Sequence, residues 1–190
     1  MEKNTQTFCS MVRCRSEQNR LAISCCRPLD MLSPVISILR QELDSMIRVI
    51  YLLLINDLSE RERLIQQTLN GERWKTKTSK GKWENVTDRK MVKASQNFQS
   101  WTKSVYEFGC SFIHLSHLHD SLAENPFKKL PQEEQRQILS HMRFYHQCPM
   151  CDHPSMEELA SYIPRVFEKI SDNLECYLKN LEQNKTINGD

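Results

Sequence analysis

Apolar residues recur at three- and four-residue steps along most of the chain, which is the spacing of one face of an α-helix. The clearest case is 34–57, "PVISILRQELDSMIRVIYLLLIND", which contains no glycine and no proline after its first residue. Its periodic positions are Ile36, Leu39, Leu43, Met46, Ile50 and Leu53. The pattern predicts a long amphipathic helix with a wide apolar face.

Four further stretches follow the same period, at 59–71, 88–122, 130–147 and 156–184. Gly109 lies inside the second of them, where a helix tolerates it at some cost or uses it for a close helix contact. The last contains an internal proline, which predicts a kink or a restart. Together the five stretches predict an all-α protein, built as an antiparallel bundle of four to five helices.

Two regions lack a clear helical period. We expect residues 1–28 to form a loosely ordered N-terminal extension or a short weak helix, followed by a helical-bundle domain at 29–184 and a tail at 185–190. Residues 72–86, "ERWKTKTSKGKWENV", carry four lysines and two tryptophans, and we expect a loop there. Positive charge beside aromatic rings is typical of single-stranded nucleic-acid binders, although a solvated loop has the same composition.

The overall charge and the apolar runs limit the partners of the chain. Its 26 basic and 24 acidic residues give a net charge of +2, so any nucleic-acid contact must come from a local basic patch. The most lipid-like run, "VIYLLLI", has only seven residues, whereas a membrane span needs about 20. We expect no membrane partner. The N-terminal residues lack the apolar core of a signal peptide, so we expect a cytoplasmic protein with reduced cysteines.

One short segment, "FIHLSHLHD" (112–120), places three histidines and an aspartate in nine positions. If it is helical, Glu107, Ser111, His114 and His117 form a polar stripe, with Asp120 one turn beyond His117. An imidazole beside a carboxylate can act as a general base or as an oriented metal ligand. The alternative is a solvated or interfacial helix face.

A second polar row lies on the helix predicted at 34–57, where Arg40, Asp44 and Arg48 recur every four residues. Charges on a largely buried helix need partners, because an unpaired buried charge is costly. If the row faces Glu107 and His117, its arginines can neutralise a phosphate while a histidine moves a proton. The structural alternative is an Arg–Asp–Arg ladder that links two helices.

The stretch "HQCPMCDH" is a candidate zinc site. A Cys-Pro-x-Cys turn presents two thiolates to one metal ion, and two histidines flank the pair. The candidate ligands are His146, Cys148, Cys151 and His153. Free thiols on a loop between helices are the alternative.

The segments "LRQELDSMIRVIYLL" and "FIHLSHLHD" resemble small bacterial helical proteins of the HEPN type, over about residues 30–184. The resemblance implies a bundle of four or five helices that cleaves RNA as a toxin or defence module, or serves as a non-catalytic companion. The Arg-x4-His match of that family is Arg136 to His141 in "RQILSH". It implies that His141 is the general base for the attacking 2′-hydroxyl, that Arg136 holds the scissile phosphate, and that the site forms across a dimer.

Two hypotheses about function follow. The first is a HEPN-like protein that binds or cleaves RNA, either at the Arg136–His141 pair or at an atypical site built from His114, His117 and the Arg40–Arg48 row. The second is a non-enzymatic module that forms a homodimer or docks a helical protein partner, with zinc as a stabilising ion.

Overall fold

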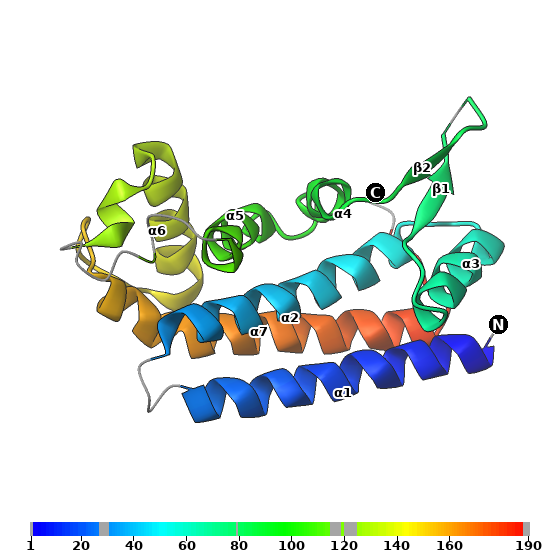
Figure 1. Ribbon diagram of the computed structural model, residues 1–190, viewed down its shortest axis with the longest axis horizontal. Coiled ribbons are helices and arrows are strands. Elements are labelled where there is room, and N and C mark those ends of the chain that lie inside the picture. Colours follow the sequence, from blue (N-terminus) through cyan, green and yellow to red (C-terminus); the bar gives the residue numbers. More distant parts are fainter. Residues whose placement is uncertain (1, 27–30, 79, 115–118, 120–124, 188–190) are drawn as a thin grey trace. The chain divides into compact units, whose positions relative to one another are not determined.

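The computed structural model describes residues 2–26, 31–78, 80–114, 119 and 125–187, and this part of the chain is mostly helical (Figure 1). The α-helices are α1 (Glu2–Cys26), α2 (Leu32–Leu53), α3 (Leu58–Leu69), α4 (Asp88–Ser95), α5 (Thr102–Ile113), α6 (Gln132–His146) and α7 (Met156–Glu182). A 3₁₀-helix, η3 (Pro126–Lys129), precedes α6. The all-α prediction is thereby confirmed. In the described ranges, no helix has the length and apolar content to cross a bilayer.

The segment predicted as a basic loop instead forms an antiparallel hairpin of β1 (Lys75–Lys77) and β2 (Trp83–Asn85), with Thr76 opposite Glu84. Buried Trp74 anchors its base, because the Trp74 carbonyl accepts from the Val86 N–H at 2.9 Å. Gly81 adopts a φ of 74°, a left-handed conformation that favours glycine in a tight turn. The loop prediction was therefore wrong, since threonines alternating with lysines fit the two faces of a strand.

The residues group into two compact units, which are described separately. The first comprises Met1–Glu17, Asp44–Ser100 and Ser171–Asp190, and the second comprises Gln18–Leu43 and Trp101–Ile170. Helices α1, α2 and α7 contribute residues to both units. The sequence pattern does not show this division, because the apolar periods of α2 and α7 continue through the boundaries at 43–44 and 170–171.

In the first unit, the C-terminal half of α2 is apolar on nearly every side. Met46, Ile47, Ile50, Leu52 and Leu53 are fully buried, with further buried residues from α1, α3, α4 and α7. These residues are Phe8, Cys9, Leu64, Ile65, Met91, Val92, Leu174, Leu178 and Leu181. A helix that is buried on nearly every side has apolar residues at consecutive positions, which explains the run "VIYLLLI".

In the second unit, α2, α5, α6 and α7 bury residues at helical spacing. The core contains Ile36, Leu39, Phe112, Phe127, Ile138, Leu139, Leu159, Ile163 and Phe167. Gly109 of α5 packs against α2 so closely that a β-carbon added to it would lie 2.8 Å from Cβ of Arg40. Gly109 therefore marks a close helix contact, one of the two alternatives the sequence offered.

The expected loosely ordered extension is corrected by α1, a continuous helix of 25 residues. Polar contacts as well as apolar burial fix this helix. Arg13 forms a two-pronged pair with Glu175 and a second pair with Glu182, with nitrogen–oxygen distances from 2.6 to 3.1 Å. Asn19 donates to the buried carboxylate of Glu42 at 2.9 Å. Partners distant in sequence supply these bonds, so local periodicity did not reveal the helix.

The helix expected at 88–122 is also corrected. It consists of α4 and α5, which the segment Gln96–Trp101 separates, and α5 ends at Ile113. His114 is the C-cap residue and has extended backbone angles, with φ −98° and ψ 143°. His114 therefore does not follow the helical repeat that the expected polar stripe requires.

Candidate functional site

Among the described residues, the arginines of the α2 row contact aromatic rings and carboxylates. Arg40 is 5% exposed, and its guanidinium carbon lies 4.0 Å from the ring centre of Tyr106. Arg48 donates to Asp44 at 3.0 Å and to Asp88 at 3.3 Å, and its guanidinium carbon lies 5.3 Å from the ring centre of Trp74. These contacts fit the structural alternative, in which charges and aromatic rings link helices.

The histidine segment is described in part. His114 is exposed, and His117 and Asp120 lie outside the described residues. His119 lies 5.7 Å from the Phe112 ring, measured between ring centres, and its Nε2 is 3.3 Å from the Ser33 hydroxyl oxygen. Glu107, the first member of the expected stripe, has its carboxylate 3.8 Å from the ammonium of Lys103.

The Arg136–His141 pair is not brought together. Five residues along an α-helix turn the side chain by about 140° from the starting direction. Arg136 is exposed and pairs with Glu133 at 3.2 Å, whereas His141 hydrogen-bonds Ser104. The two residues of the motif therefore have the expected spacing in the sequence, but they do not share a face of α6.

The Cys-Pro-Met-Cys turn is organised by an arginine. Arg143 donates to the Pro149 carbonyl at 2.9 Å and to the Cys151 carbonyl at 2.8 Å, and it pairs with Asp152. Cys151 and His153 are exposed, and His146 lines a cavity. A hydrogen bond that the Tyr162 hydroxyl donates to the Cys148 sulfur is the main cause that raises the pKa of Tyr162. Within the described ranges, no three His, Cys, Asp or Glu side chains are grouped to hold a metal ion.

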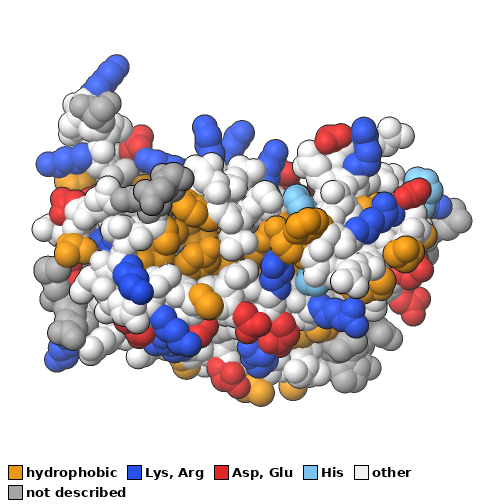
Figure 2. Space-filling model, turned by 180° about the vertical axis from the view of Figure 1, so that it is seen from behind, with side chains coloured by type: hydrophobic (Ala, Val, Ile, Leu, Met, Phe, Trp, Pro, Cys, Tyr) orange, Lys and Arg blue, Asp and Glu red, His pale blue; other side chains and the backbone are white. Residues whose placement is uncertain are grey.

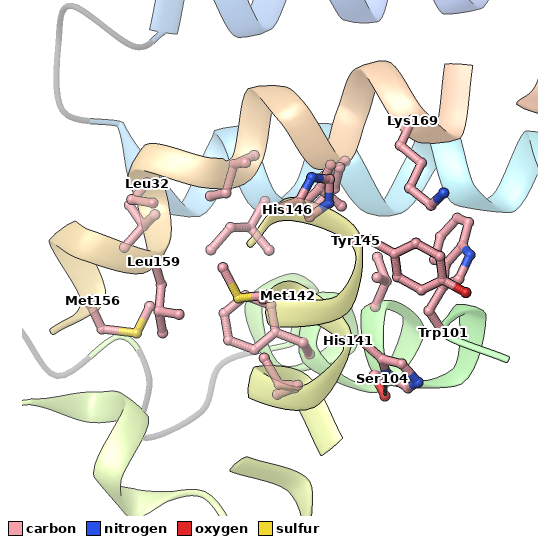
Figure 3. A pocket seen from close by; sticks show the side chains of 18 residues that line it. Leu32, Trp101, Ser104, His141, Met142, Tyr145, His146, Met156, Leu159 and Lys169 are labelled. Carbon is pink, nitrogen blue, oxygen red and sulfur yellow. Dashed lines mark hydrogen bonds between the residues drawn. The ribbon is translucent and has the colours of Figure 1, made fainter. Parts of the chain in front are cut away.

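A cavity of about 80 Å³ lies in the second unit among α2, α5, α6 and α7, and we call it the Tyr145 cavity (Figure 3). Most of its wall is aliphatic or aromatic. The apolar wall includes Leu32, Ile36, Leu39, Val105, Phe108, Ile138, Met142, Met156, Leu159, Ala160, Ile163 and Val166. The cavity is partly open to solvent, and an apolar wall of this kind accepts the apolar part of a ligand.

The polar groups of the Tyr145 cavity are few and lie close together. Figure 3 shows Ser104, His141, Tyr145, Trp101 and Lys169 on one side of it, away from Met156 and Leu159. The Ser104 hydroxyl oxygen is 3.1 Å from Nδ1 of His141. The Lys169 ammonium lies 4.1 Å from the ring centre of Tyr145 and 5.7 Å from that of Trp101, so it rests on aromatic faces.

Both histidines of the Tyr145 cavity are kept neutral by their surroundings. Burial lowers the pKa of His141. For His146, burial is the largest cause of a lowered pKa, and the charges of Lys169 and Arg165 lower it further. A hydroxyl beside a neutral imidazole can be a base-activated nucleophile. Within the described part of the chain, however, no carboxylate hydrogen-bonds His141 to orient it, and Ser104 is 6% exposed.

The hairpin of the first unit is a second candidate site. Lys75, Lys77, Lys80 and Lys82 are exposed, and basic side chains line the projecting hairpin in Figure 2. Trp83 is 54% exposed. The Arg63 guanidinium carbon lies 4.7 Å from its ring centre and the Lys77 ammonium 5.2 Å, so cations fix the ring while leaving much of it open to solvent.

Sequence reasoning identified the basic segment but missed Ser104, Tyr145 and Lys169. The sequence did contain a signal for them, because His141, Tyr145 and Lys169 are polar residues within segments whose other periodic positions are apolar. Trp101 and Ser104 are three residues apart, the spacing of neighbours on one helix face.

Compared with known protein families, curated proteins and solved structures, the chain matches none.

Proposed function

We propose that this protein binds single-stranded RNA through the β1–β2 hairpin, with Trp83 as the stacking platform and the hairpin lysines as phosphate contacts. The observation that carries the proposal is a half-exposed tryptophan, fixed by Arg63 and Lys77, on a hairpin with four exposed lysines. Base stacking on an aromatic ring tolerates any sequence, and lysines that neutralise phosphates release counterions.

The charge balance of the hairpin supports the proposal. Two carboxylates near it are engaged by other groups, since Glu84 pairs with Lys90 at 2.6 Å and Glu60 pairs with Arg63 at 2.6 Å. These two carboxylates therefore do not neutralise Lys75, Lys80 and Lys82. The hairpin is locally positive, although the whole chain carries a net charge of only +2. A local basic patch on a nearly neutral chain is what a nucleic-acid contact here requires.

The proposal includes three expectations from the sequence as one hypothesis. The protein is HEPN-like, forms a bundle of four to five helices, and is located in the cytoplasm. The proposal favours the non-catalytic branch of that resemblance, because Arg136 and His141 occupy different faces of α6. The cleaving branch has a separate test. RNA fragments that disappear with His141→Gln would assign a nuclease.

Fluorescence anisotropy with labelled 12-nucleotide oligouridine tests binding. Because stacking contributes about 1–3 kcal/mol per base, Trp83→Ala should weaken binding by about 5- to 100-fold. The double variant Lys80→Gln/Lys82→Gln should reduce the salt slope by about 1.4, since each phosphate contact on a single strand contributes about 0.7. Lys128→Gln/Lys179→Gln removes the same charge outside the hairpin and should leave the slope unchanged.

Oligothymidine and a 12-base-pair RNA duplex complete the comparison. Tighter binding of oligouridine than of the duplex supports a single-strand platform. Equal binding of oligothymidine would assign the site to single strands in general. Binding that ignores Trp83→Ala would remove the hairpin from the proposal.

A second candidate function, self-association or docking of a helical partner, is favoured by two exposed apolar side chains. Phe144 of α6 is 78% exposed and Met150 is 84% exposed. We propose sedimentation analysis of the wild type and of Phe144→Ser as its test. A dimer that Phe144→Ser dissociates supports it, and a monomer in both cases removes it. Elemental analysis of the same samples tests zinc, which requires about one ion per chain and its loss in Cys148→Ser.

A further inference from the structure

The Tyr145 cavity combines an apolar interior with one cation, and the RNA hypothesis makes no use of either. We propose that the Tyr145 cavity binds a small amphipathic carboxylic acid, with the hydrocarbon part among the α2, α6 and α7 side chains and the carboxylate beside the Lys169 ammonium. This inference is independent of the RNA proposal, because the cavity and the hairpin belong to different units.

The apolar part of the ligand follows from the wall. Leu32, Met142, Leu159 and Ile163 are lining residues whose side chains contain only carbon and sulfur atoms. Figure 3 shows Leu32 and Leu159 apart from the polar cluster. Ligand pockets are lined mainly by apolar side chains with a few placed polar groups that fix orientation. An unbranched alkyl chain or a phenyl group suits such a wall, because neither carries a polar atom that would lose its hydrogen bonds.

The anionic end follows from Lys169. Its ammonium rests on the rings of Tyr145 and Trp101, and among the described residues no carboxylate lies within ion-pair distance of it. Aromatic faces attract the cation without neutralising it, so one positive charge remains beside an apolar cavity. A ligand with one negative charge matches this cation.

The neighbouring groups favour a single carboxylate over a dianion. Because burial lowers the pKa values of His141 and His146, neither adds a second positive charge near neutral pH. When the Ser104 hydroxyl donates to Nδ1 of His141, Nε2 carries the proton and is a hydrogen-bond donor. A carboxylate oxygen could then accept from Nε2 while the other oxygen faces Lys169.

Isothermal titration calorimetry with three ligands of equal chain length tests the inference: octanoate, 1-octanol and octylammonium. Octanoate should bind about tenfold more tightly than 1-octanol, the effect of one charge-assisted hydrogen bond. Octylammonium should bind more weakly than either. Lys169→Met should remove the advantage of octanoate and leave 1-octanol binding unchanged, whereas Lys179→Met, outside the cavity, should preserve the order.

A second variant tests the cavity itself. Ala160→Phe places a ring in it and should weaken octanoate and 1-octanol alike by at least tenfold, with thermal unfolding as the check on the fold. If this variant does not fold, Ala160→Leu replaces it. Three results would each overturn the inference. They are undetectable binding of octanoate to the wild type, equal affinity for the three ligands, and affinities that the substitution at Ala160 leaves unchanged.

Discussion

Arg40 of α2 packs against Gly109 of α5 in the second unit so closely that a β-carbon on the glycine would lie 2.8 Å from the arginine Cβ. The same Arg40 side chain extends under the ring of Tyr106, one turn before Gly109. The absence of a side chain at position 109 therefore lets a buried guanidinium reach an aromatic face. This packing offers a physical reason for a glycine inside a helix, where glycine costs about 1 kcal/mol relative to alanine.

Gly109→Ala should destabilise the protein by about 1–3 kcal/mol, although alanine is the better helix former. The added carbon meets the Arg40 Cβ rather than the flexible end of a side chain, so α2 and α5 must separate. Urea unfolding measures the change, with Lys103→Ala on the exposed side of α5 as the control. A stability gain in Gly109→Ala would contradict the close contact.

Arg61 of α3 is 2% exposed and donates to the carbonyls of Ile55 at 2.8 Å and Lys185 at 3.0 Å. Arg61→Ala should cost about 2–3 kcal/mol, because it leaves these carbonyls without their charged donor. Arg61→Lys should recover less than half of the loss, since one ammonium lacks the two-pronged geometry. Chemical denaturation gives both values, and an unchanged midpoint in Arg61→Ala would contradict this role.

The pair between Arg13 and Glu182 should make stability depend on acid. The hydrogen bond from Arg13 is the main cause that lowers the pKa of Glu182, so the unfolded chain takes up this proton at a higher pH than the folded one. The stabilisation is therefore complete above the ordinary glutamate pKa of about 4.3. It is lost as the pH falls through the pKa that Glu182 has in the folded state.

Arg13→Gln should accordingly lose about 1 kcal/mol at pH 7, a modest value because solvent screens these half-exposed groups. The difference from the wild type should shrink as the pH falls below about 4. Denaturation curves at pH 7, 5 and 3 measure it, in a double-mutant cycle with Glu182→Gln. A difference that stays constant across this range would contradict the ion pair.

The half-buried histidines of the Tyr145 cavity predict a second pH dependence. Because burial lowers the pKa of His141, the unfolded state binds the proton first as the pH falls below the ordinary value of about 6.5. The free energy of unfolding should thus decrease from pH 7.5 to pH 5.5, and His141→Gln should reduce this slope. The exposed His153→Gln is the matched control. A slope that His141→Gln leaves unchanged would contradict a half-buried, neutral imidazole at this position.

The sequence predicted the helices whose apolar period is local and failed where partners distant in the chain decide the structure. Periodic leucines and isoleucines gave α2, α3, α6 and α7 within a few residues. Helix α1 has a weak period, and its stability depends on Arg13 and Asn19 meeting Glu175 and Glu42, which no local window contains.

The candidate sites show the same division. Trp83 and its lysines were visible as a composition, but the hairpin that fixes them was not. The Tyr145 cavity joins residues of four helices, so Ser104, His141 and Lys169 could be related only after folding. Of the predicted histidine stripe, His114 lies just beyond the end of α5 at Ile113, and His117 lies outside the described residues.

Quenching of tryptophan fluorescence by oligouridine tests the central proposal most directly. Trp74 and Trp101 are 2% exposed and Trp83 is 54% exposed, so a base that stacks on this protein should quench Trp83 selectively. We predict saturable quenching in the wild type that weakens with added salt and disappears in Trp83→Leu. Emission that stays unchanged up to saturating RNA, or equal quenching in Trp83→Leu, would contradict the hairpin as the RNA platform.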